Sequence, residues 1–407
     1  MTATEPSRAK RSDAEVDLLR ALQRYGRQSR AELSRRLQVQ RSTATKIVRH
    51  LLETGTVREV EEAGDVSHRG AGRPGQGIEL SPDHIHFLGA EVGVGYVRVL
   101  RMDLLGQVRA TGSEKVSIAD QSPEQTADIC LRLLEDCAEN APRLGGLAVA
   151  LPGIVRRDGT VVRVPKLGWR DIPFKEILRP HTNRFGPLSL ENDANAFAMG
   201  ELIRHGYGER EFALFVYIVS GVGGAIVDRG TFLTGQSGLA GEFGHVYVRR
   251  KGLDGSLPTE RLEEIAGIDA LFARYRFLGG TGESLENLMS DLAIGAAPAT
   301  RTIEEWISAL AQALAGLTSI LNPQRILIGG PMADLLEQVR DPLVDELRAL
   351  TMHGTPTPQI DISHTAENAV ILGCAEIQRL AYLQEGSPFN DRQKAKDWNK
   401  PPLRVDG

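Results

Sequence analysis

Apolar and polar residues alternate along the segment 86–108, HFLGAEVGVGYVRVLRMDLLGQV, on both sides of a glycine-rich kink. A period of two residues predicts the two strands of a hairpin. The segment 214–235, LFVYIVSGVGGAIVDRGTFLTG, repeats the order of apolar strand, G-x-G kink, second strand and turn. Two such hairpins, about 130 residues apart, predict a duplicated domain that holds a ligand between its halves.

A period near 3.6 residues replaces this alternation in the first 55 residues. SDAEVDLLRALQRYG predicts a helix that ends at Gly26 and has one apolar face, formed by Val16, Leu19 and Leu22. Ser29 and Glu32 have the spacing of a capping box and predict a second, short helix. RSTATKIVRHLLETG predicts a third helix that ends at Gly55 and whose buried stripe is formed by Ala44, Ile47, Val48 and Leu51.

The outward positions of this third helix are small hydroxyls and cations: Arg41, Ser42, Thr43, Thr45, Lys46 and Arg49. A helix of this kind fits the major groove of DNA, where hydroxyls and arginines reach base edges and phosphates. The strands TVREV and GIEL follow, and the polar segment between them is typical of a wing, with Arg69 and Arg73 near its tip. Residues 13–80 therefore predict a winged helix-turn-helix domain. A small helical protein-interaction module with a basic face is the alternative.

Length and charge refine this division. With 407 residues, 41 % apolar and 25 % charged, the chain is too long for one typical core and suits a globular protein of two or three domains. Its net charge is −5, but residues 1–80 hold 15 Lys and Arg against 11 Asp and Glu. A basic head on an acidic body suggests that the head meets a polyanion. Because one such head offers little contact, we expect a homodimer or homotetramer on a two-fold double-stranded operator.

Other classes of protein are disfavoured by the sequence. No apolar run approaches membrane-spanning length and the N-terminus lacks a secretion signal, so a cytoplasmic location without a membrane partner is expected. Cys130, Cys137 and Cys374 have neither a disulfide nor a metal-knuckle spacing. Cys130 and Cys137 lie seven residues apart in a helical stretch, which favours a place in the core.

Five short segments follow one another in the body: LPGIV, ENDANA, GVGGAIV, GEFGH and NPQRILIGG. In this order they resemble the ROK family of repressors, open reading frames and sugar kinases, and the head resembles that of its sugar-responsive repressor branch. The resemblance implies an actin-like, two-lobed α/β ATPase fold of the ribonuclease H-like type. The first lobe would comprise residues 84–198 and 366–385 and the second residues 199–365. The polar ends, 1–12 and 386–407, are expected to be disordered.

The resemblance also implies a sugar site. Asp193 matches the carboxylate that takes the proton from the attacking hydroxyl in a sugar kinase. The residues matching those that hold the sugar are Gly153, Asn192, Glu242, His245 and Glu263. Such groups suit a polyol because each hydroxyl both donates and accepts. Simpler roles stay open: Asn192 or Asp193 as a helix cap, Glu263 as a solvated charge, and His245 as a buried, hydrogen-bonded histidine.

Two neighbouring residues bear on the identity of the ligand. Trp169 in KLGWRD is either a stacking platform for a sugar or a core residue. Lys166 stands about where sugar-binding members often have asparagine. The effector is therefore predicted only as a monosaccharide or an amino sugar.

The chain departs from the family in its metal loop. Family members commonly bind a structural zinc through the histidine of the GEFGH-type segment and a C-x-C-G-x-x-G-C run. Here the run reads GLDGSLPTERLEE and has no cysteine. Because His245 alone cannot complete a tetrahedral site, no metal is predicted. The loop should then be held by packing and hydrogen bonds, or be mobile until a ligand binds.

The phosphate loops depart further. Kinase members carry a D-x-G-G-T-type loop where this chain has Glu91, Gly93 and Gly95 without the threonine, and the longer Glu91 carboxylate would crowd a metal. The other glycine-rich positions are kept, namely Ser220, Gly221, Gly223, Gly224, Gly329 and Gly330. Phosphoryl transfer depends on positioning and charge neutralisation, so the loss of one wall should be severe. We interpret these segments as vestigial nucleotide loops and expect no cofactor.

The sequence therefore predicts a sequence-specific transcriptional regulator, with repression the favoured direction, of carbohydrate-metabolism genes. Its kinase-derived body would sense a sugar without phosphorylating it, and Asp193 would be a vestigial base. The first alternative is a bifunctional ATP-dependent, glucokinase-like sugar kinase with a DNA-binding head. The second is a DNA-binding scaffold that answers to a protein partner.

Overall fold

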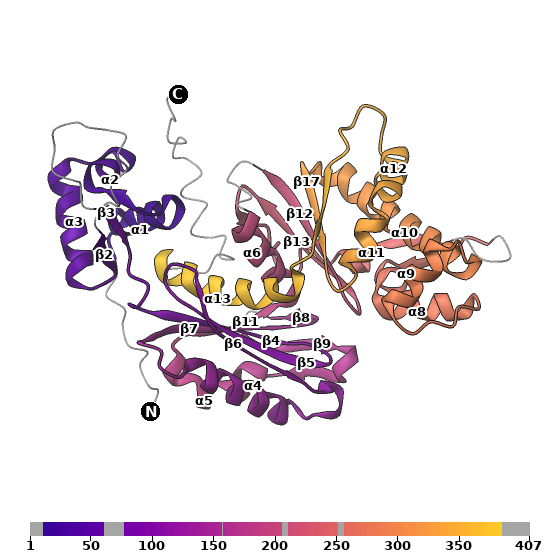
Figure 1. Cartoon of the computed structure of the whole chain (residues 1–407), viewed down its shortest axis with the longest axis horizontal. Helices are drawn as coiled ribbons and strands as arrows, with labels where there is room; N and C mark the ends of the chain where they lie inside the picture. Colours follow the sequence, from indigo (N-terminus) through magenta and orange to yellow (C-terminus); the bar gives the residue numbers. More distant parts are fainter. Residues whose placement is uncertain (1–10, 61–76, 157, 206–210, 251–255, 385–407) are drawn as a thin grey trace. The chain divides into compact units, whose positions relative to one another are not determined.

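The computed structural model describes residues 11–60, 77–156, 158–205, 211–250 and 256–384 (Figure 1). Arg69 and Arg73 of the predicted wing, and nearly all of both predicted disordered tails, lie outside these ranges. The chain divides into two compact units. The first comprises residues 1–149, 174–189 and 374–388, and the second comprises residues 150–173, 190–373 and 389–407. The lobe boundaries expected from the sequence stay a prediction, since these units divide the chain at other points.

The head forms three helices and a small sheet in the first unit. The helices are α1 (Asp13–Tyr25), α2 (Arg30–Arg36) and α3 (Arg41–Glu53). The strands β1 (Gln28–Ser29), β2 (Val57–Val60) and β3 (Gly77–Leu80) pair in the order β1-β3-β2. The predicted capping box of Ser29 and Glu32 is present, and a second one, formed by Ser12 and Glu15, starts α1. The segments with a helical period thus form the three helices of a winged helix-turn-helix domain.

Burial on α3 follows the predicted stripe with one difference. Ala44, Val48 and Leu51 are buried, whereas Ile47 is only half-buried. On α1 the core residues are Leu18, Leu19, Ala21 and Leu22, and Val16 near the start of the helix is half-buried. Leu19 and Leu22 are thus buried as predicted, and the apolar face of α1 is centred about one residue later than the sequence suggested.

A five-stranded sheet with the order β11-β7-β4-β5-β6 follows the head. Its strands are β4 (His86–Val92), β5 (Tyr96–Met102), β6 (Val108–Lys115), β7 (Leu144–Leu151) and β11 (Leu188–Asn192). Figure 1 shows α4 (Pro123–Ala138) and α5 (Phe174–Thr182) on one face and the C-terminal half of α13 (Ala366–Gln384) on the other. The first predicted hairpin is β4 and β5, which pair antiparallel from Phe87 and Met102 to Val92 and Val97.

All three cysteines are buried, in agreement with the core role predicted for Cys130 and Cys137. Burial raises the pKa of the Cys130 thiol to about 12. On the opposite face of the sheet, the Cys374 thiol donates to the carbonyl of Ala90 at 3.4 Å. These thiols pack helices onto the sheet rather than forming a reactive centre.

The second unit contains another five-stranded sheet, with the order β14-β13-β12-β17-β18. Its strands are β12 (Phe212–Ile218), β13 (Val222–Asp228), β14 (Thr231–Phe232), β17 (Arg325–Gly329) and β18 (Gln359–Ser363). The predicted second hairpin is β12 and β13, and β12 and β17 run parallel. Figure 1 shows α6 (Asp193–His205) on one side of this sheet and α10 (Ala297–Leu321) and α12 (Arg340–Leu350) on the other.

The remaining elements of the second unit surround its core. The helices are α7 (Glu263–Ala266), α8 (Ile268–Phe277), α9 (Leu285–Ala293) and α11 (Ala333–Gln338). The strands β8 (Ile154–Val155), β9 (Val161–Val164) and β10 (Trp169–Ile172) form one small sheet, and β15 (Tyr247–Arg249) and β16 (Thr259–Arg261) form another. Within this core the buried Trp306 donates from Nε1 to the carbonyl of Ala266 at 3.0 Å.

Within the second unit, α6 crosses the N-terminal part of α13 with the two backbones in contact. Gly200 of α6 lies against the Ala369 carbonyl of α13, and Gly373 lies against the Ala196 carbonyl. Both helices present a small-x-x-x-small pair at the crossing, and an added Cβ at either glycine would overlap the partner's main chain. The position of α6 is therefore coupled to that of α13.

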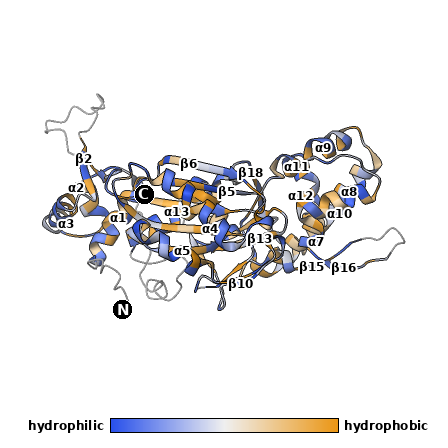
Figure 2. Cartoon of the chain, turned by 90° about the horizontal axis from the view of Figure 1, so that it is seen from below, coloured by the Kyte–Doolittle hydropathy of each residue, from blue (hydrophilic) through white to orange (hydrophobic). Residues whose placement is uncertain are grey.

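Hydrophobic residues are concentrated where the elements pack. Figure 2 shows orange stretches along the strands and mixed blue and orange along the covering helices. None of the helices in the described ranges has the length and apolar character that a membrane crossing requires. The two sheets, each extended from a glycine-kinked hairpin, confirm the predicted actin-like α/β body behind a winged helix-turn-helix head.

Candidate functional site

The predicted sugar-binding segments converge on the β12–β13 hairpin of the second unit. Gly223 lies against the Cβ of Ala194 in the first turn of α6, and Gly224 lies under the ring of Phe243. On the same hairpin, a Cβ added at Gly221 would be 3.5 Å from the Glu263 carboxylate. Glycine is needed at Gly223 and Gly224 because Ala194 and Phe243 approach the hairpin backbone closely, whereas the contact at Gly221 is an ordinary one. The hairpin thus brings the starts of α6 and α7 and the 241–245 segment together.

Asn192 ends β11 and caps α6. Its Oδ1 accepts hydrogen bonds from the backbone N–H groups of Ala194 at 2.9 Å and Asn195 at 3.2 Å. Its Nδ2 donates to the carbonyl of Gly153 at 2.9 Å. The cap role that the sequence left open for Asn192 is therefore present, and the same side chain holds the predicted Gly153 segment.

Asn192 connects two other predicted sugar residues, Gly153 through its side chain and Asp193 as the next residue of the chain. Gly153 has φ of +83°, and an added Cβ would overlap the carbonyl of Arg163, so only glycine fits. Asp193 is 9 % exposed and its Oδ1 accepts from the Ala194 N–H at 2.8 Å. A buried carboxylate at the start of a helix is stabilised by the free N–H groups and the dipole there.

Glu242, His245 and Glu263 form a second polar group beside the hairpin. The His245 Nε2 and Glu263 Oε1 atoms are 4.0 Å apart, and Arg261 Nη1 lies 3.7 Å from the same oxygen. Burial raises the pKa of the Glu242 carboxyl, the nearby Glu263 charge adds to this, and His245 opposes it. His245 is about half exposed, which excludes the fully buried role considered for it.

Lys166 and Asp269 form an ion pair elsewhere in the second unit. Lys166 Nζ donates to Asp269 Oδ2 at 2.7 Å, and Asp269 also bonds the side chain of Ser220. Burial alone would raise the pKa of Asp269, but these hydrogen bonds and the charge of Lys166 outweigh it and lower the pKa. Trp169 is 4 % exposed, so the core reading of this residue is the correct one.

The first hairpin, β4–β5, holds one residue that the sequence reading missed. The Tyr96 ring lies over Gly93, where an added Cβ would be 2.5 Å from the ring, and the Tyr96 hydroxyl donates to the buried Glu91 at 2.7 Å. The Arg98 guanidinium covers the ring at 4.1 Å from its centroid. Tyr96 follows the kink directly and could have been noticed as a large side chain next to a supposed phosphate loop. Gly95 has open space around its Cβ position.

β17 ends at Gly329 and Gly330 follows it directly, and close packing accounts for both glycines. Gly330 has φ of +135° and lies against the carbonyl of Ile218, and Gly329 lies against the ring of Phe197. These glycines therefore have a structural reason independent of any nucleotide.

The described ends of the loop that lacks cysteines are held by hydrogen bonds. Strands β15 and β16 pair antiparallel, and Arg250 pairs with Glu260 at 2.6 Å. Gln312 of α10 accepts from the Arg249 N–H at 3.0 Å and donates to the Arg249 carbonyl at 2.9 Å. Within the described ranges no group of three or more potential metal-binding side chains occurs. Absence of a metal stays a prediction.

The helix α3, predicted to bind DNA, presents the predicted cations to solvent. Arg41, Lys46 and Arg49 are exposed and hold no ion pair within the described part of the chain, and Ser42 and Thr43 are also exposed. Thr45 is half-buried, and its Oγ1 donates to the Arg41 carbonyl at 2.8 Å. Two other arginines of the head are paired: Arg58 with Glu79 at 2.7 Å, and Arg30 with Glu59.

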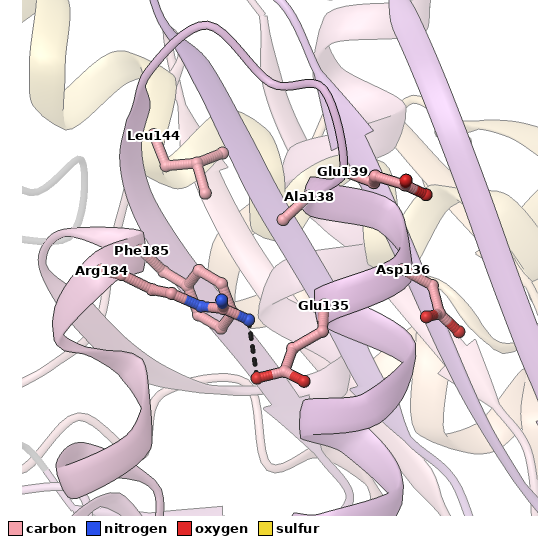
Figure 3. A pocket seen from close by; sticks show the side chains of 7 residues that line it. All are labelled: Glu135, Asp136, Ala138, Glu139, Leu144, Arg184 and Phe185. Carbon is pink, nitrogen blue, oxygen red and sulfur yellow. Dashed lines mark ion pairs between the residues drawn. The ribbon is translucent and has the colours of Figure 1, made fainter.

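A shallow hollow at the C-terminal end of α4 contains none of the predicted residues (Figure 3). Its walls are Glu135, Asp136, Ala138, Glu139, Leu144, Arg184 and Phe185. Arg184 crosses it to pair with Glu135 at 2.6 Å. This surface ion pair anchors the 183–185 turn to α4 and offers no converging polar groups for a ligand.

The fold and these sites define a DNA-binding head on an actin-like sugar-kinase body. A model of the ROK family matches residues 87–379, and a model of the MarR family matches residues 12–65. The chain belongs to the ROK family.

Named relatives include both repressors and kinases. The xylose repressor of Caldicellulosiruptor bescii is 24 % identical over 369 residues, 85 % of this chain and 90 % of its own. The transcriptional repressor Mlc of Escherichia coli is 27 % identical, covering 81 % and 83 %. The glucokinase of Thermotoga maritima is 30 % identical, covering 59 % and 80 %. A solved ROK family transcriptional regulator, described as a homolog of Mlc, superposes with a TM-score of 0.74 at 22 % identity, over 92 % of this chain and 99 % of its own.

Proposed function

We propose that this protein is a sequence-specific transcriptional regulator whose head binds double-stranded DNA and whose body senses a monosaccharide or amino sugar. Relatives named xylose repressor and repressor Mlc span at least four-fifths of the chain. They favour repression of carbohydrate-metabolism genes.

The DNA-binding surface of this proposal is the exposed side of α3. Arg41, Lys46 and Arg49 have no ion-pair partner among the described residues, so phosphates can neutralise them without breaking an existing pair. Ser42 and Thr43 occupy the first turn, which in a winged helix-turn-helix reaches base edges. Arg69 and Arg73 would add wing contacts. A homodimer or homotetramer would place two such helices on a two-fold operator.

The sugar surface is the polar set around the β12–β13 hairpin. Asn192, Asp193, Glu242, His245 and Glu263 supply acceptors and donors from three segments that the hairpin holds together. A pyranose offers several hydroxyls that each donate and accept, and this mixed set can satisfy them. Lys166 and Asp269 would bound the site and contribute to the choice of sugar.

The position of Tyr96 is the observation that best supports a sugar sensor without kinase activity. Phosphoryl transfer requires a glycine-rich cradle open to the nucleotide phosphates and a bound magnesium. In this chain the Tyr96 ring covers Gly93, and its hydroxyl binds Glu91. The carboxylate that would lie near the metal is thus engaged with a tyrosine of its own hairpin. We infer that the body retains sugar recognition and has lost phosphoryl transfer.

The test is operator binding at fixed salt with and without each of D-xylose, D-glucose and N-acetyl-D-glucosamine. One sugar should change the operator affinity by about 5- to 150-fold, the usual range of such couplings. The same sugar should raise the melting temperature of the wild type. If no sugar affects either measurement, the scaffold that answers to a protein partner is the better reading.

A second candidate, an ATP-dependent sugar kinase, is favoured by Asp193 at the start of α6 and by the glucokinase relative. A coupled assay with ATP, magnesium and the same sugars separates the two. Turnover above about 1 per second, within the range of ordinary enzymes, would overturn the sensor proposal.

A further inference from the structure

Within the first unit, the C-terminal half of α13 contacts Gln23 of the DNA-binding head and two residues that flank the head in the sequence, Arg11 and His84. Gln23 of α1 donates from Nε2 to Glu376 Oε1 at 3.4 Å. Further along α13, the Tyr382 hydroxyl lies 2.8 Å from His84 Nε2, and the Tyr382 carbonyl accepts from Arg11 at 2.5 Å. We propose that this face of α13 is the docking surface for the head and that α13 transmits the effector state to the recognition helix.

Glu376 is held rigidly for this contact. Its side chain is 1 % exposed and forms a two-point ion pair with Arg379, at 2.5 and 2.6 Å. Arg379 in turn donates from Nη1 to the Leu104 carbonyl at 3.1 Å. A bidentate pair of this kind fixes both side chains in orientation as well as in distance. Gln23 therefore meets a carboxylate oxygen that cannot turn away to solvent.

Tyr382 and His84 form the second contact. The Tyr382 ring lies 5.7 Å from the ring of Phe87 in β4, and the Arg11 guanidinium covers it at 4.4 Å. While His84 Nε2 faces Tyr382, its Nδ1 lies 3.5 Å from where a Cβ added at Gly55 would be. Gly55 is the residue after the C-cap of α3. His84 thus stands between the end of the recognition helix and α13.

The N-terminal half of α13 faces the predicted sugar segments through α6. In the second unit, Gly373 and Gly200 bring the backbones of α13 and α6 into contact, and α6 begins at the cap residue Asn192. Because these backbones touch without intervening side chains, a shift of α6 on sugar binding must displace α13. α13 is one continuous helix over Ala366–Gln384, so both sets of contacts are made by the same helix. The transmission of a sugar signal through α13 rests on the proposed function. The docking surface for the head does not.

The experiment compares three full-length proteins: wild type, the double variant Gln23→Ala/Tyr382→Phe, and Gln338→Ala as control. The double variant removes both side-chain contacts and leaves the Glu376–Arg379 pair and the Tyr382 ring in place. Gln338 is an exposed glutamine at the end of α11. None of these residues belongs to the proposed DNA or sugar surface.

Operator affinity is measured by fluorescence anisotropy with and without D-xylose, D-glucose or N-acetyl-D-glucosamine, and sugar affinity by calorimetry. We expect the double variant to bind the sugar within about twofold of wild type, while the ratio of operator affinities with and without sugar falls to less than half of the wild-type ratio. Gln338→Ala should keep the wild-type ratio. An unchanged ratio in the double variant would overturn the role of α13 in transmission.

Hydrogen exchange of the sugar-free proteins tests the docking surface by itself. Undocking should speed exchange in α1 and in residues 81–85 of the double variant, relative to wild type and Gln338→Ala. Equal protection in all three proteins would overturn the docking surface. If the wild-type operator affinity ignores every sugar while exchange still responds, the proposed effector function fails and the docking surface stands.

Discussion

Asn192 binds Gly153 and α6 with opposite ends of one side chain. Its Nδ2 donates to the Gly153 carbonyl at 2.9 Å, while its Oδ1 accepts from the Ala194 N–H at the same distance. The amide therefore fixes the Gly153 segment relative to the start of α6, where Asp193 lies. An aspartate or an alanine at this position could make only one of these connections or neither.

Replacing Asn192 by alanine should abolish sugar-induced stabilisation and lower stability by about 0.5–2 kcal/mol through the lost cap. A thermal-shift titration with and without sugar measures both effects. Ser284→Ala is the matched control, because Ser284 caps α9 of the same unit and accepts from the Asn287 N–H at 3.2 Å. It should lose comparable stability and keep its response to sugar. A full sugar response in Asn192→Ala would contradict the assigned site.

Glu242 should make the sugar-free protein less stable near neutral pH. Burial raises its pKa above the ordinary value of 4.5, so the folded state binds this proton more tightly than the unfolded state. The protonated Glu242 therefore adds to the free energy of unfolding below pH 4.5, and this contribution is lost as the pH rises through the pKa of the folded protein. Glu242→Gln should melt higher than wild type at pH 7, and the difference should shrink towards pH 4.5.

The same variant should bind sugar more weakly, since a carboxylate accepts stronger hydrogen bonds than an amide. Glu286→Gln, an exposed change on α9, should leave both melting and sugar binding as in wild type. If Glu242→Gln melts below wild type at pH 7 without sugar, burial of the charge is not the dominant effect at this residue.

Removing a cation from α3 should weaken operator binding and reduce its salt dependence. Arg41→Ala, Lys46→Ala or Arg49→Ala should each lower the slope of log affinity against log salt by about 1 if it removes a phosphate contact. Arg348→Ala on α12 is the control and should leave the slope unchanged. Anisotropy measured at several salt concentrations gives the slopes. Three unchanged slopes would place the DNA on another surface.

Gln312→Ala should loosen the β15–β16 hairpin. The side chain makes two hydrogen bonds with the Arg249 main chain, each of about 1 kcal/mol. For a unit of this size the melting temperature should fall by about 2–4 °C for each kcal/mol lost.

Treatment of the wild type with EDTA should leave its melting temperature unchanged. A marked fall with EDTA would contradict the prediction that the protein binds no metal.

Gly373→Ala should strongly destabilise the protein, because the new Cβ would overlap the Ala196 carbonyl of α6. We expect a loss of about 1–3 kcal/mol from overpacking. Gly316→Ala is the control, since Gly316 also lies inside a helix but has open space around its Cβ position. It should stabilise by about 0.4–1 kcal/mol. Equal melting temperatures for the two variants would mean that α6 and α13 do not touch at Gly373.

Local patterns were sufficient to predict several elements of this protein. The spacing of Ser29 and Glu32 predicted the start of α2, because a capping box is made by residues three apart. The alternation on either side of each glycine kink predicted the hairpins β4–β5 and β12–β13. The order of the motifs, rather than any one of them, identified the family, since each short motif alone is common.

Roles that depend on neighbours distant in sequence were decided only by the tertiary structure. Trp169 could be a sugar platform or a core residue until its surroundings showed it to be buried. Asn192 proved to be both a cap and a tie to Gly153, 39 residues away. Tyr96 looked like an ordinary strand residue, yet its ring lies over Gly93.

The sequence by itself determined which segments become helices, hairpins and tight glycine turns, because those choices depend on residues within one or two turns of each other. The tertiary structure decided which side chains share a surface, as between Gln23 and Glu376, which are 353 residues apart. Such contacts depend on the packing of whole elements, and no local period records them. This is why the helix α3 could be predicted from the sequence, while the contact between Gln23 and α13 could not.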